Sequence, residues 1–303
     1  MWSKELAAVK AAAVVAGSLP APAAYRLGSA TGRMIGRLPD FDGRRALVAS
    51  HLERVTGSAR AATGRSLVPE VFANYGRYWA ESLRLPHVAT DRVVAAVTTE
   101  GEDHVDAGLA AGRGVIIAAP HLGGWEWGAR YLVARGVRVT VAVEDLQPPD
   151  LFDWFVAFRR RLGVNVVAVG PGASTAILQA LADNHAVCLL SDRLVGATSG
   201  MEATFFGAPT PMPAGPVTLA VRSNAPLVAA AIYFAHGVDG HHIVFRPPLA
   251  LAPARGERLR DVVRKGTQEL AHELEVLIRE APTQWHLVQP NWPDDPPLGR
   301  QQG

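Results

Sequence analysis

The chain has 303 residues, of which 49% are hydrophobic and 19% are charged, so it can bury a sizeable core. Its 30 lysines and arginines against 28 acidic residues give a formal net charge of +2, which is too balanced to indicate a nucleic-acid-binding surface. We therefore expect no nucleic-acid partner. A single cysteine, Cys188, excludes an internal disulfide and fits a reducing, cytosolic setting.

Residues 1–90 are predicted to form a helical N-terminal region. Alanine, leucine and arginine predominate there, and the pattern breaks at residues 18–22, 38–40 and 57–58. Helices that combine apolar and arginine side chains could lie on a membrane surface. Packing of these helices against the rest of the chain is the alternative.

Two further features of this region bear on its environment. Phe72, Tyr75 and Trp79 recur at helical spacing, and a stripe of this kind is more often part of a core than of a ligand site. Lys4 and Lys10 precede a short alanine-rich run that superficially resembles a signal peptide. The run is short and meets prolines early, and no stretch approaches the ~18 consecutive apolar residues of a membrane span. We expect a protein that is not exported.

Residues 91–290 are predicted to form an α/β body. Strands are expected at residues 114–119, 137–143, 164–169, 186–191, 226–234 and 242–245. Helices are expected at residues 124–134, 149–162, 173–184, 213–223 and 257–280. This alternation predicts a mostly parallel central sheet flanked by helices. No linker divides the chain, so we expect one structural domain, with residues 291–303 as a flexible tail.

The most informative motif is the segment Pro120–Glu126, which follows the first of these strands. His121 stands where the strand gives way to a helix, and Glu126 follows five positions later. A neutral imidazole beside a carboxylate can activate a substrate hydroxyl, because the carboxylate fixes the tautomer and stabilises the imidazolium. We therefore predict that His121 and Glu126 form a catalytic dyad. A helix-capping histidine with an unrelated acid is the structural alternative.

Further polar residues follow other predicted strands. Asp192 and Arg193 come after one strand, Glu144 comes after another, and Glu202 lies ten residues beyond Asp192. Ligands of open α/β sheets gather at the carboxyl ends of strands, so one pocket could collect these residues with His121. The alternatives are an Asp192–Arg193 pair within a loop and a series of tight turns around Glu202.

A set of motifs resembles a known family in order and spacing over roughly residues 20–295. The matching pieces are His121-Leu-Gly-Gly-Trp-Glu126, Ser191-Asp-Arg193, Glu202-Ala-Thr-Phe-Phe-Gly207, Pro213-Ala-Gly-Pro216 and Trp285-His-Leu-Val-Gln289. The chain resembles the bacterial lysophospholipid acyltransferase superfamily, specifically the branch of lipid A late acyltransferases and actinobacterial phosphatidylinositol mannoside acyltransferases. The last motif, with two aspartates after it, favours the mannoside side of this branch.

The resemblance implies an enzyme bound peripherally to the cytoplasmic face of the plasma membrane. It would transfer a fatty acyl group from acyl-CoA, its co-substrate, to a mannose hydroxyl of a phosphatidylinositol mannoside, without a further cofactor. Its partners would be acyl-CoA, the glycolipid acceptor and the membrane surface. The alternatives are a lipid A-type or other lipid acyltransferase with a different acceptor, and a non-catalytic lipid-binding protein.

The resemblance also assigns roles to single residues. His121 and Glu126 match the catalytic dyad, although the mannoside branch often has aspartate where Glu126 stands. Asp192 and Arg193 fall at substrate-binding positions.

Three further positions carry expected roles by the same resemblance. Glu144 matches an acid near the site, and Arg159 matches a substrate-contacting arginine, for which Arg160 is the alternative if the register slips by one. Glu202 matches a supporting acid.

The residues themselves are compatible with direct acyl transfer. The backbone N–H groups of Gly124 and Trp125, at the expected start of a helix, could stabilise an oxyanion. No Gly-x-Ser-x-Gly motif occurs, which argues against a serine hydrolase. The histidines show no convincing metal-ligand spacing, so we expect no metal.

Overall fold

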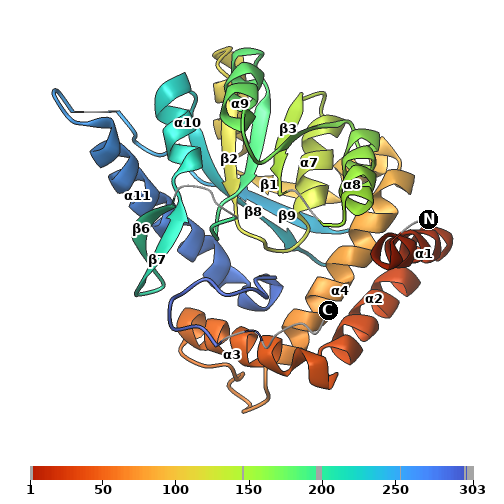
Figure 1. The fold of residues 1–303 in the computed structure, drawn as a ribbon. Helices are drawn as coiled ribbons and strands as arrows, with labels where there is room; N and C mark the ends of the chain where they lie inside the picture. Colours follow the sequence, from red (N-terminus) through yellow and green to blue (C-terminus); the bar gives the residue numbers. More distant parts are fainter. Residues whose placement is uncertain (1–2, 145–146, 196–199, 253, 297, 299–303) are drawn as a thin grey trace.

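A computed structural model describes residues 3–144, 147–195, 200–252, 254–296 and 298 of the chain (Figure 1). It shows an α/β body built on a mostly parallel seven-stranded sheet, with a helical N-terminal region beside it. The fold class predicted from the sequence is therefore confirmed.

The central sheet has the strand order β1-β9-β8-β2-β5-β3-β4. Its strands are β1 (Val97–Glu100), β2 (Val115–Ala119), β3 (Val139–Val143), β4 (Val164–Ala168), β5 (Ala186–Leu190), β8 (Leu227–Phe234) and β9 (His241–Phe245). All neighbours are parallel except β8 and β9, which pair antiparallel. β2 lies at the centre and is buried along its whole length, which explains its continuous run of apolar residues.

Helices cover both faces of the sheet. Alternate residues of β2 enter two cores, with Ile116 and Ala118 on one face and Val115 and Ile117 on the other. The first face carries α9 (Ala173–Ala182), α10 (Gly215–Ser223) and α11 (Leu259–Glu280). The second carries α5 (Thr90–Ala95), α6 (Glu102–Ala110), α7 (Trp125–Ala134) and α8 (Pro149–Arg161). The predicted helices of the body therefore match α7 to α11.

Three strands were not predicted from the sequence. β1 is only four residues long, and β6 (Gly200–Phe205) and β7 (Ala208–Pro213) form an antiparallel hairpin in the proline-rich stretch for which a series of tight turns was the alternative. The hairpin is a separate two-stranded sheet, so its prolines interrupt no central ladder. Ala203 and Phe205 point from β6 into the core beside α11.

The N-terminal region consists of four longer helices. These are α1 (Lys4–Ser18), α2 (Ala21–Ile35), α3 (Asp42–Thr56) and α4 (Val68–Arg84). Short 3₁₀ turns occur at Pro39–Phe41, Leu85–His87 and Pro282–Gln284. The predicted breaks at residues 18–22, 38–40 and 57–58 coincide with the ends of helices and the connections between them. Within the described part of the chain, no helix has the length and apolar character needed to cross a membrane.

The beginning of the predicted flexible tail is instead packed against the body. Trp292 is buried and donates a hydrogen bond from Nε1 to the Phe205 carbonyl. Asp295 accepts hydrogen bonds from the backbone N–H groups of Asn291 and Trp292 and contacts His51 at 3.1 Å. Trp292 and Asp295, at the start of the predicted tail, therefore have buried partners in the body, and the tail as a whole stays a prediction.

Glycines allow α2 and α4 to pack closely. A Cβ atom at Gly32 would lie 2.1 Å from the Phe72 carbonyl oxygen, and one at Gly76 would lie 2.1 Å from the Gly28 carbonyl oxygen. Real contacts of this kind are much longer, so a side chain at either position forces the helices apart.

We predict that Gly32→Ala destabilises the protein by at least ~1–3 kcal/mol, because the added methyl group meets backbone that cannot rotate away. Gly215→Ala is the matched control, since Gly215 is also helical and a Cβ there meets nothing within 4 Å. The control should be neutral or stabilising by ~0.5–1 kcal/mol. Urea denaturation measures both, and equal effects would contradict the close-packing explanation.

Candidate active site

His121 and Asp192 meet at the carboxyl ends of two neighbouring parallel strands. β2 and β5 are paired in a register that places Ala119 opposite Leu190. His121 and Asp192 each follow two residues beyond that pair, so the parallel register brings both side chains to the same edge of the sheet. The structure therefore brings together these two residues that the sequence placed at strand ends.

The imidazole of His121 is bound to a fully buried carboxylate. His121 Nδ1 lies 2.6 Å from Asp192 Oδ1, and the His121 backbone N–H donates to Asp192 Oδ2 at 3.0 Å. Burial alone would raise the pKa of Asp192, but the charge of His121 and the hydrogen bonds to the carboxylate hold it below its usual value. An ionised Asp192 fixes the proton on Nδ1, which leaves the lone pair of Nε2 available to accept a proton.

Glu126 has a different partner in the structure. It lies in the first turn of α7, is almost fully buried, and accepts hydrogen bonds from Arg159 Nη2 at 2.7 Å and Nε at 3.2 Å. Within the described residues, the carboxylate bonded to the His121 imidazole is that of Asp192. The dyad role expected for Glu126 stays a prediction.

Of the other expected site residues, Arg193 and Glu144 pair with each other, whereas Glu202 is exposed on β6. Arg193 Nη2 donates to Glu144 Oε2 at 2.8 Å, and these two side chains form an ion pair. The alternative was a pair between Asp192 and Arg193 within a loop. The structure instead pairs Arg193 with Glu144. Glu202 is exposed on β6, on the opposite side of the strand from Ala203, which faces the core. The structure therefore does not bring Glu202 into contact with the His121 pair.

The two candidate oxyanion donors also differ. The Gly124 N–H donates to the Ile232 carbonyl at 3.1 Å, which occupies this amide. Trp125 is the first residue of α7, where backbone N–H groups have no acceptor within the helix. We retain the Trp125 amide as the predicted oxyanion donor.

Two residues near the C-terminus enter the site without having been assigned a role. Trp285 Nε1 donates to Asp192 Oδ2 at 2.7 Å, and His286 Nε2 donates to the Gly123 carbonyl at 3.2 Å. The Trp285-His286 motif contributed to the family resemblance, but nothing in its local sequence indicates a contact with Asp192.

A narrow apolar cavity of about 70 Å³ begins beside Glu126 and Arg159. It runs between the sheet and α7, and Cys188 is part of its wall. Burial raises the pKa of the Cys188 thiol to about 12, so this group is not a thiolate at neutral pH.

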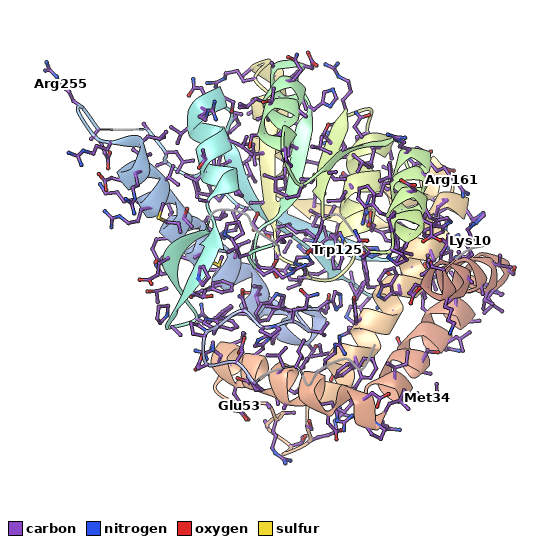
Figure 2. All side chains as sticks on the ribbon, in the orientation of Figure 1. Lys10, Met34, Glu53, Trp125, Arg161 and Arg255 are labelled. Carbon is purple, nitrogen blue, oxygen red and sulfur yellow. The ribbon has the colours of Figure 1, made fainter. Side chains whose placement is uncertain are left out.

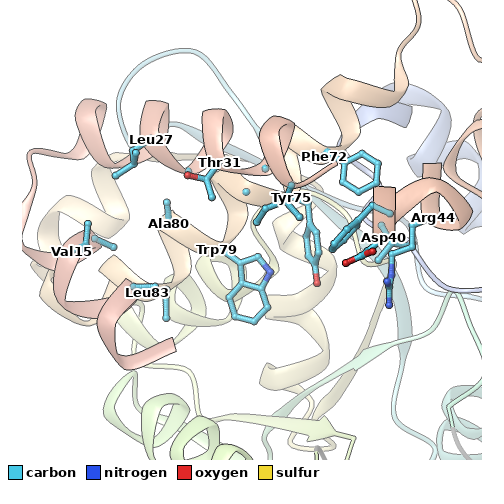
Figure 3. Close-up of a pocket in the computed structure, with 18 of the residues that line it drawn as sticks. Val15, Leu27, Thr31, Asp40, Arg44, Phe72, Tyr75, Trp79, Ala80 and Leu83 are labelled. Carbon is cyan, nitrogen blue, oxygen red and sulfur yellow. The ribbon is translucent and has the colours of Figure 1, made fainter. Parts of the chain in front are cut away.

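A larger cavity of about 1400 Å³ lies among α1, α2 and α4 (Figure 3). Val15, Leu27 and Leu83 line one end, whereas Asp40 and Arg44 lie at the other. The predicted aromatic stripe is part of its wall: Phe72, Tyr75 and Trp79 all line the cavity. The expectation that the stripe packs into the core holds for Phe72, which is also buried in a cluster between α3 and α4.

Aromatic rings connect this cavity to His121. The ring centroids of Tyr75 and His286 lie 5.4 Å apart, and those of His286 and Trp125 lie 5.7 Å apart. The ring centroid of Trp125 lies 5.5 Å from that of His121. In the view of Figure 2 the label of Trp125 lies near the middle of the molecule, and the residue is half-buried. A continuous series of aromatic contacts therefore links a wall residue of the large cavity, Tyr75, to His121, and Trp125 of this series also lines the narrow cavity.

Comparison with known proteins gives the class of this protein, which is an acyltransferase. The sequence profile of the bacterial lipid A biosynthesis acyltransferase family matches residues 5–293, and the chain belongs to this family. It is 35% identical over 252 residues to the phosphatidylinositol mannoside acyltransferase of Mycobacterium tuberculosis, covering 80% of this chain and 75% of that protein. It is 33% identical over 245 residues to the protein of the same name from Mycolicibacterium smegmatis, covering 80% and 77%. The resemblance inferred from the motifs is confirmed.

The buried His286 predicts a pH dependence of stability. Burial lowers the pKa of His286 from 6.5 to about 3, so the unfolded chain takes up a proton at a higher pH than the folded one. The contribution of neutral His286 to the free energy of unfolding is fully present above pH 6.5 and is lost as the pH falls towards 3. The free energy of unfolding should fall by up to ~1.4 kcal/mol per pH unit from this group.

Urea denaturation between about pH 4 and about pH 7 measures this slope. His286→Phe should make the slope shallower, because the phenyl ring takes up no proton. His272→Gln is the matched control, since His272 is exposed on α11. An unchanged slope in His286→Phe would contradict the prediction.

Proposed function

We propose that this protein transfers a fatty acyl group from acyl-CoA to a mannose hydroxyl of a phosphatidylinositol mannoside. Membership in an acyltransferase family and the names of the mycobacterial relatives support the reaction and the acceptor. The observation that carries the chemistry is the 2.6 Å contact between His121 and the buried Asp192. This contact orients an imidazole as a base, next to Trp125 of the narrow cavity.

The proposed step is direct attack. The acceptor hydroxyl gives its proton to His121 Nε2 while its oxygen forms a bond to the thioester carbonyl carbon. The Trp125 amide stabilises the oxyanion of the tetrahedral intermediate. Collapse of the intermediate breaks the carbon–sulfur bond, and the CoA thiolate leaves and takes up a proton from the imidazolium. Asp192 stabilises the positive charge of His121 between these two transfers.

The roles of Asp192 and Glu126 can be separated by mutation. His121→Ala and Asp192→Asn should each lower kcat by about 10²–10⁴-fold, because a positioned base contributes that much. If Glu126 acts through Arg159, then Glu126→Gln and Arg159→Gln should have similar effects, mainly on the KM for one substrate. If Glu126 orients the imidazole as the sequence predicts, Glu126→Gln should lower kcat as Asp192→Asn does, and Glu126→Asp should retain some activity.

Steady-state kinetics with purified protein, acyl-CoA and phosphatidylinositol mannoside measure these effects. Glu53→Gln is the control, since Glu53 is exposed on α3 (Figure 2). Wild-type turnover in His121→Ala would overturn the mechanism. Turnover with an acyl carrier protein but not with acyl-CoA would overturn the proposed donor, and products on a different acceptor lipid would overturn the proposed acceptor.

The narrow cavity is the proposed seat of the donor acyl chain. Its wall combines Trp125, whose amide would bind the carbonyl oxygen, with apolar side chains that include Ile243 and Phe245 of β9. A chain that extends from the thioester into this cavity leaves CoA at the open end. Apolar burial of each methylene then contributes ~0.8 kcal/mol to binding.

Cys188 tests this placement. Cys188→Leu narrows the cavity and should shift the preference towards shorter acyl-CoA chains than the wild type prefers. Cys188→Ala should keep the wild-type preference or shift it towards longer chains. Competition between acyl-CoA species, with products measured by mass spectrometry, gives the ratio. Identical preferences in both variants would place the acyl chain elsewhere. Loss of turnover in Cys188→Ala, with an acyl group trapped on Cys188 of the wild type, would contradict direct transfer.

The large cavity is the proposed position of the acceptor. Its apolar end suits lipid chains, and Arg44 at its polar end suits a phosphate. Tyr75 extends the wall of this cavity towards His286 and His121. Arg159 and Arg193 are the further arginines proposed for anion recognition, and each already carries a carboxylate partner, so a bound phosphate would compete with Glu126 or Glu144.

We also propose that α2 and the turn after it bind the cytoplasmic face of the membrane peripherally. Leu27, Met34 and Leu38 are 48%, 60% and 45% exposed. Leu27 and Met34 are about two helical turns apart and so lie on one side of α2, and Leu38 follows shortly after the end of that helix. Each is preceded by an exposed arginine, at positions 26, 33 and 37. Apolar side chains flanked by arginines are typical of a helix that lies at a lipid surface.

The double substitution Leu27→Glu and Met34→Glu should weaken binding to vesicles that contain anionic lipid at least about tenfold, since it removes apolar contacts and adds repulsion. Vesicle sedimentation at low salt measures this. Leu259→Glu is the matched control, because Leu259 is 49% exposed at the start of α11 on the other side of the molecule (Figure 1). Wild-type protein that stays in the supernatant would overturn the membrane proposal.

A further inference from the structure

A short segment near the C-terminus holds the backbone around His121. Trp285 forms an isolated antiparallel bridge with Leu122. The His286 N–H donates to the His121 carbonyl at 2.7 Å, and the Gly123 N–H donates to the Gln284 carbonyl at 2.9 Å. The residues on both sides of the base are therefore bonded to residues 284–286, which we call the C-terminal clasp.

The same segment reaches the partner of the base. Asp192 is fully buried, and its Oδ2 atom accepts from the His121 backbone N–H at 3.0 Å and from Trp285 Nε1 at 2.7 Å. Two donors on Oδ2 fix the rotation of the carboxylate, and Oδ1 is then directed at His121 Nδ1, 2.6 Å away. The indole is itself held in place, because Trp285 is only 4% exposed and packs against His51 and Phe206.

From these contacts we infer that Trp285 is a positioning residue for the acyl-transfer base. It acts through Asp192, and the C-terminal clasp fixes the backbone of His121 at the same time. This inference rests on the proposed function of His121. A buried hydrogen bond to a charged group is among the stronger ones in a protein, and its loss lets the carboxylate turn away from the imidazole.

Trp285→Phe tests the inference, because it keeps an aromatic ring and removes the N–H donor. We expect kcat to fall about tenfold while the KM values for both substrates stay within about twofold. Loss of the donor also leaves more negative charge facing His121, so the acidic limb of the kcat–pH profile should move to higher pH by about half a unit or more. If Trp285 had only a structural role in the core, the acidic limb would not move, and kcat would not fall while the KM values stayed unchanged.

Trp292→Phe is the matched control. Trp292 is equally buried in the same C-terminal segment, but its Nε1 donates to the Phe205 carbonyl and not to Asp192. The control should have wild-type kcat and an unmoved pH limb, with a loss of thermal stability comparable to that of Trp285→Phe. Because Trp285→Phe could leave a gap, 3-benzothienylalanine at position 285 provides a second variant that replaces N–H by sulfur in the same ring shape.

The outcomes separate this inference from the proposed function. Wild-type kcat and pH profile in both position-285 variants, with an inactive His121→Ala, would overturn the positioning role alone. An equal loss of kcat in Trp292→Phe would also overturn it, since the effect would then belong to the core. Full activity of His121→Ala would overturn the proposed base itself.

Discussion

The site depends on one buried carboxylate. Asp192 has no exposed surface, and its negative charge is stable there because His121 and Trp285 donate hydrogen bonds to it. Three parts of the chain therefore meet at this group: the end of β2, the end of β5 and the segment after α11. The parallel pairing of β2 with β5 sets the first contact, and the packing of α11 against the sheet delivers the third.

Most of the body could be predicted because its elements have local signals. The buried strand β2 is a continuous apolar run, and α11 shows a long helical periodicity, so both were expected within two residues of their observed bounds. The hairpin β6–β7 was missed because its prolines argue against a strand, a rule that holds for central strands but not for a two-stranded ribbon. Trp292 was assigned to a tail because its hydrogen-bond partner, the Phe205 carbonyl, lies 87 residues earlier in the chain and has no local signal.

The site residues that have a local sequence signal could also be predicted. His121 was identified from a motif that is local, and Asp192 from its position at a strand end. Glu126 was favoured as the partner of His121 because a spacing of five is visible in the sequence, whereas in the structure its carboxylate contacts Arg159 of α8. The Asp192 contact depends on which strands are neighbours, and Trp285 lies 93 residues further along the chain. Neither contact has a local signature.

The distance between these contributors has a consequence for synthesis on the ribosome. A nascent chain that has emerged only as far as β5 contains His121 and Asp192 and can begin to pair their strands, but it lacks the indole donor that completes the carboxylate's hydrogen bonds. Burying that carboxylate early is costly, so closure of this edge of the sheet is expected to be a late folding event. Partly made chains then lack the complete set of hydrogen bonds at Asp192, and the arrangement around His121 forms only once nearly the whole chain has been synthesised.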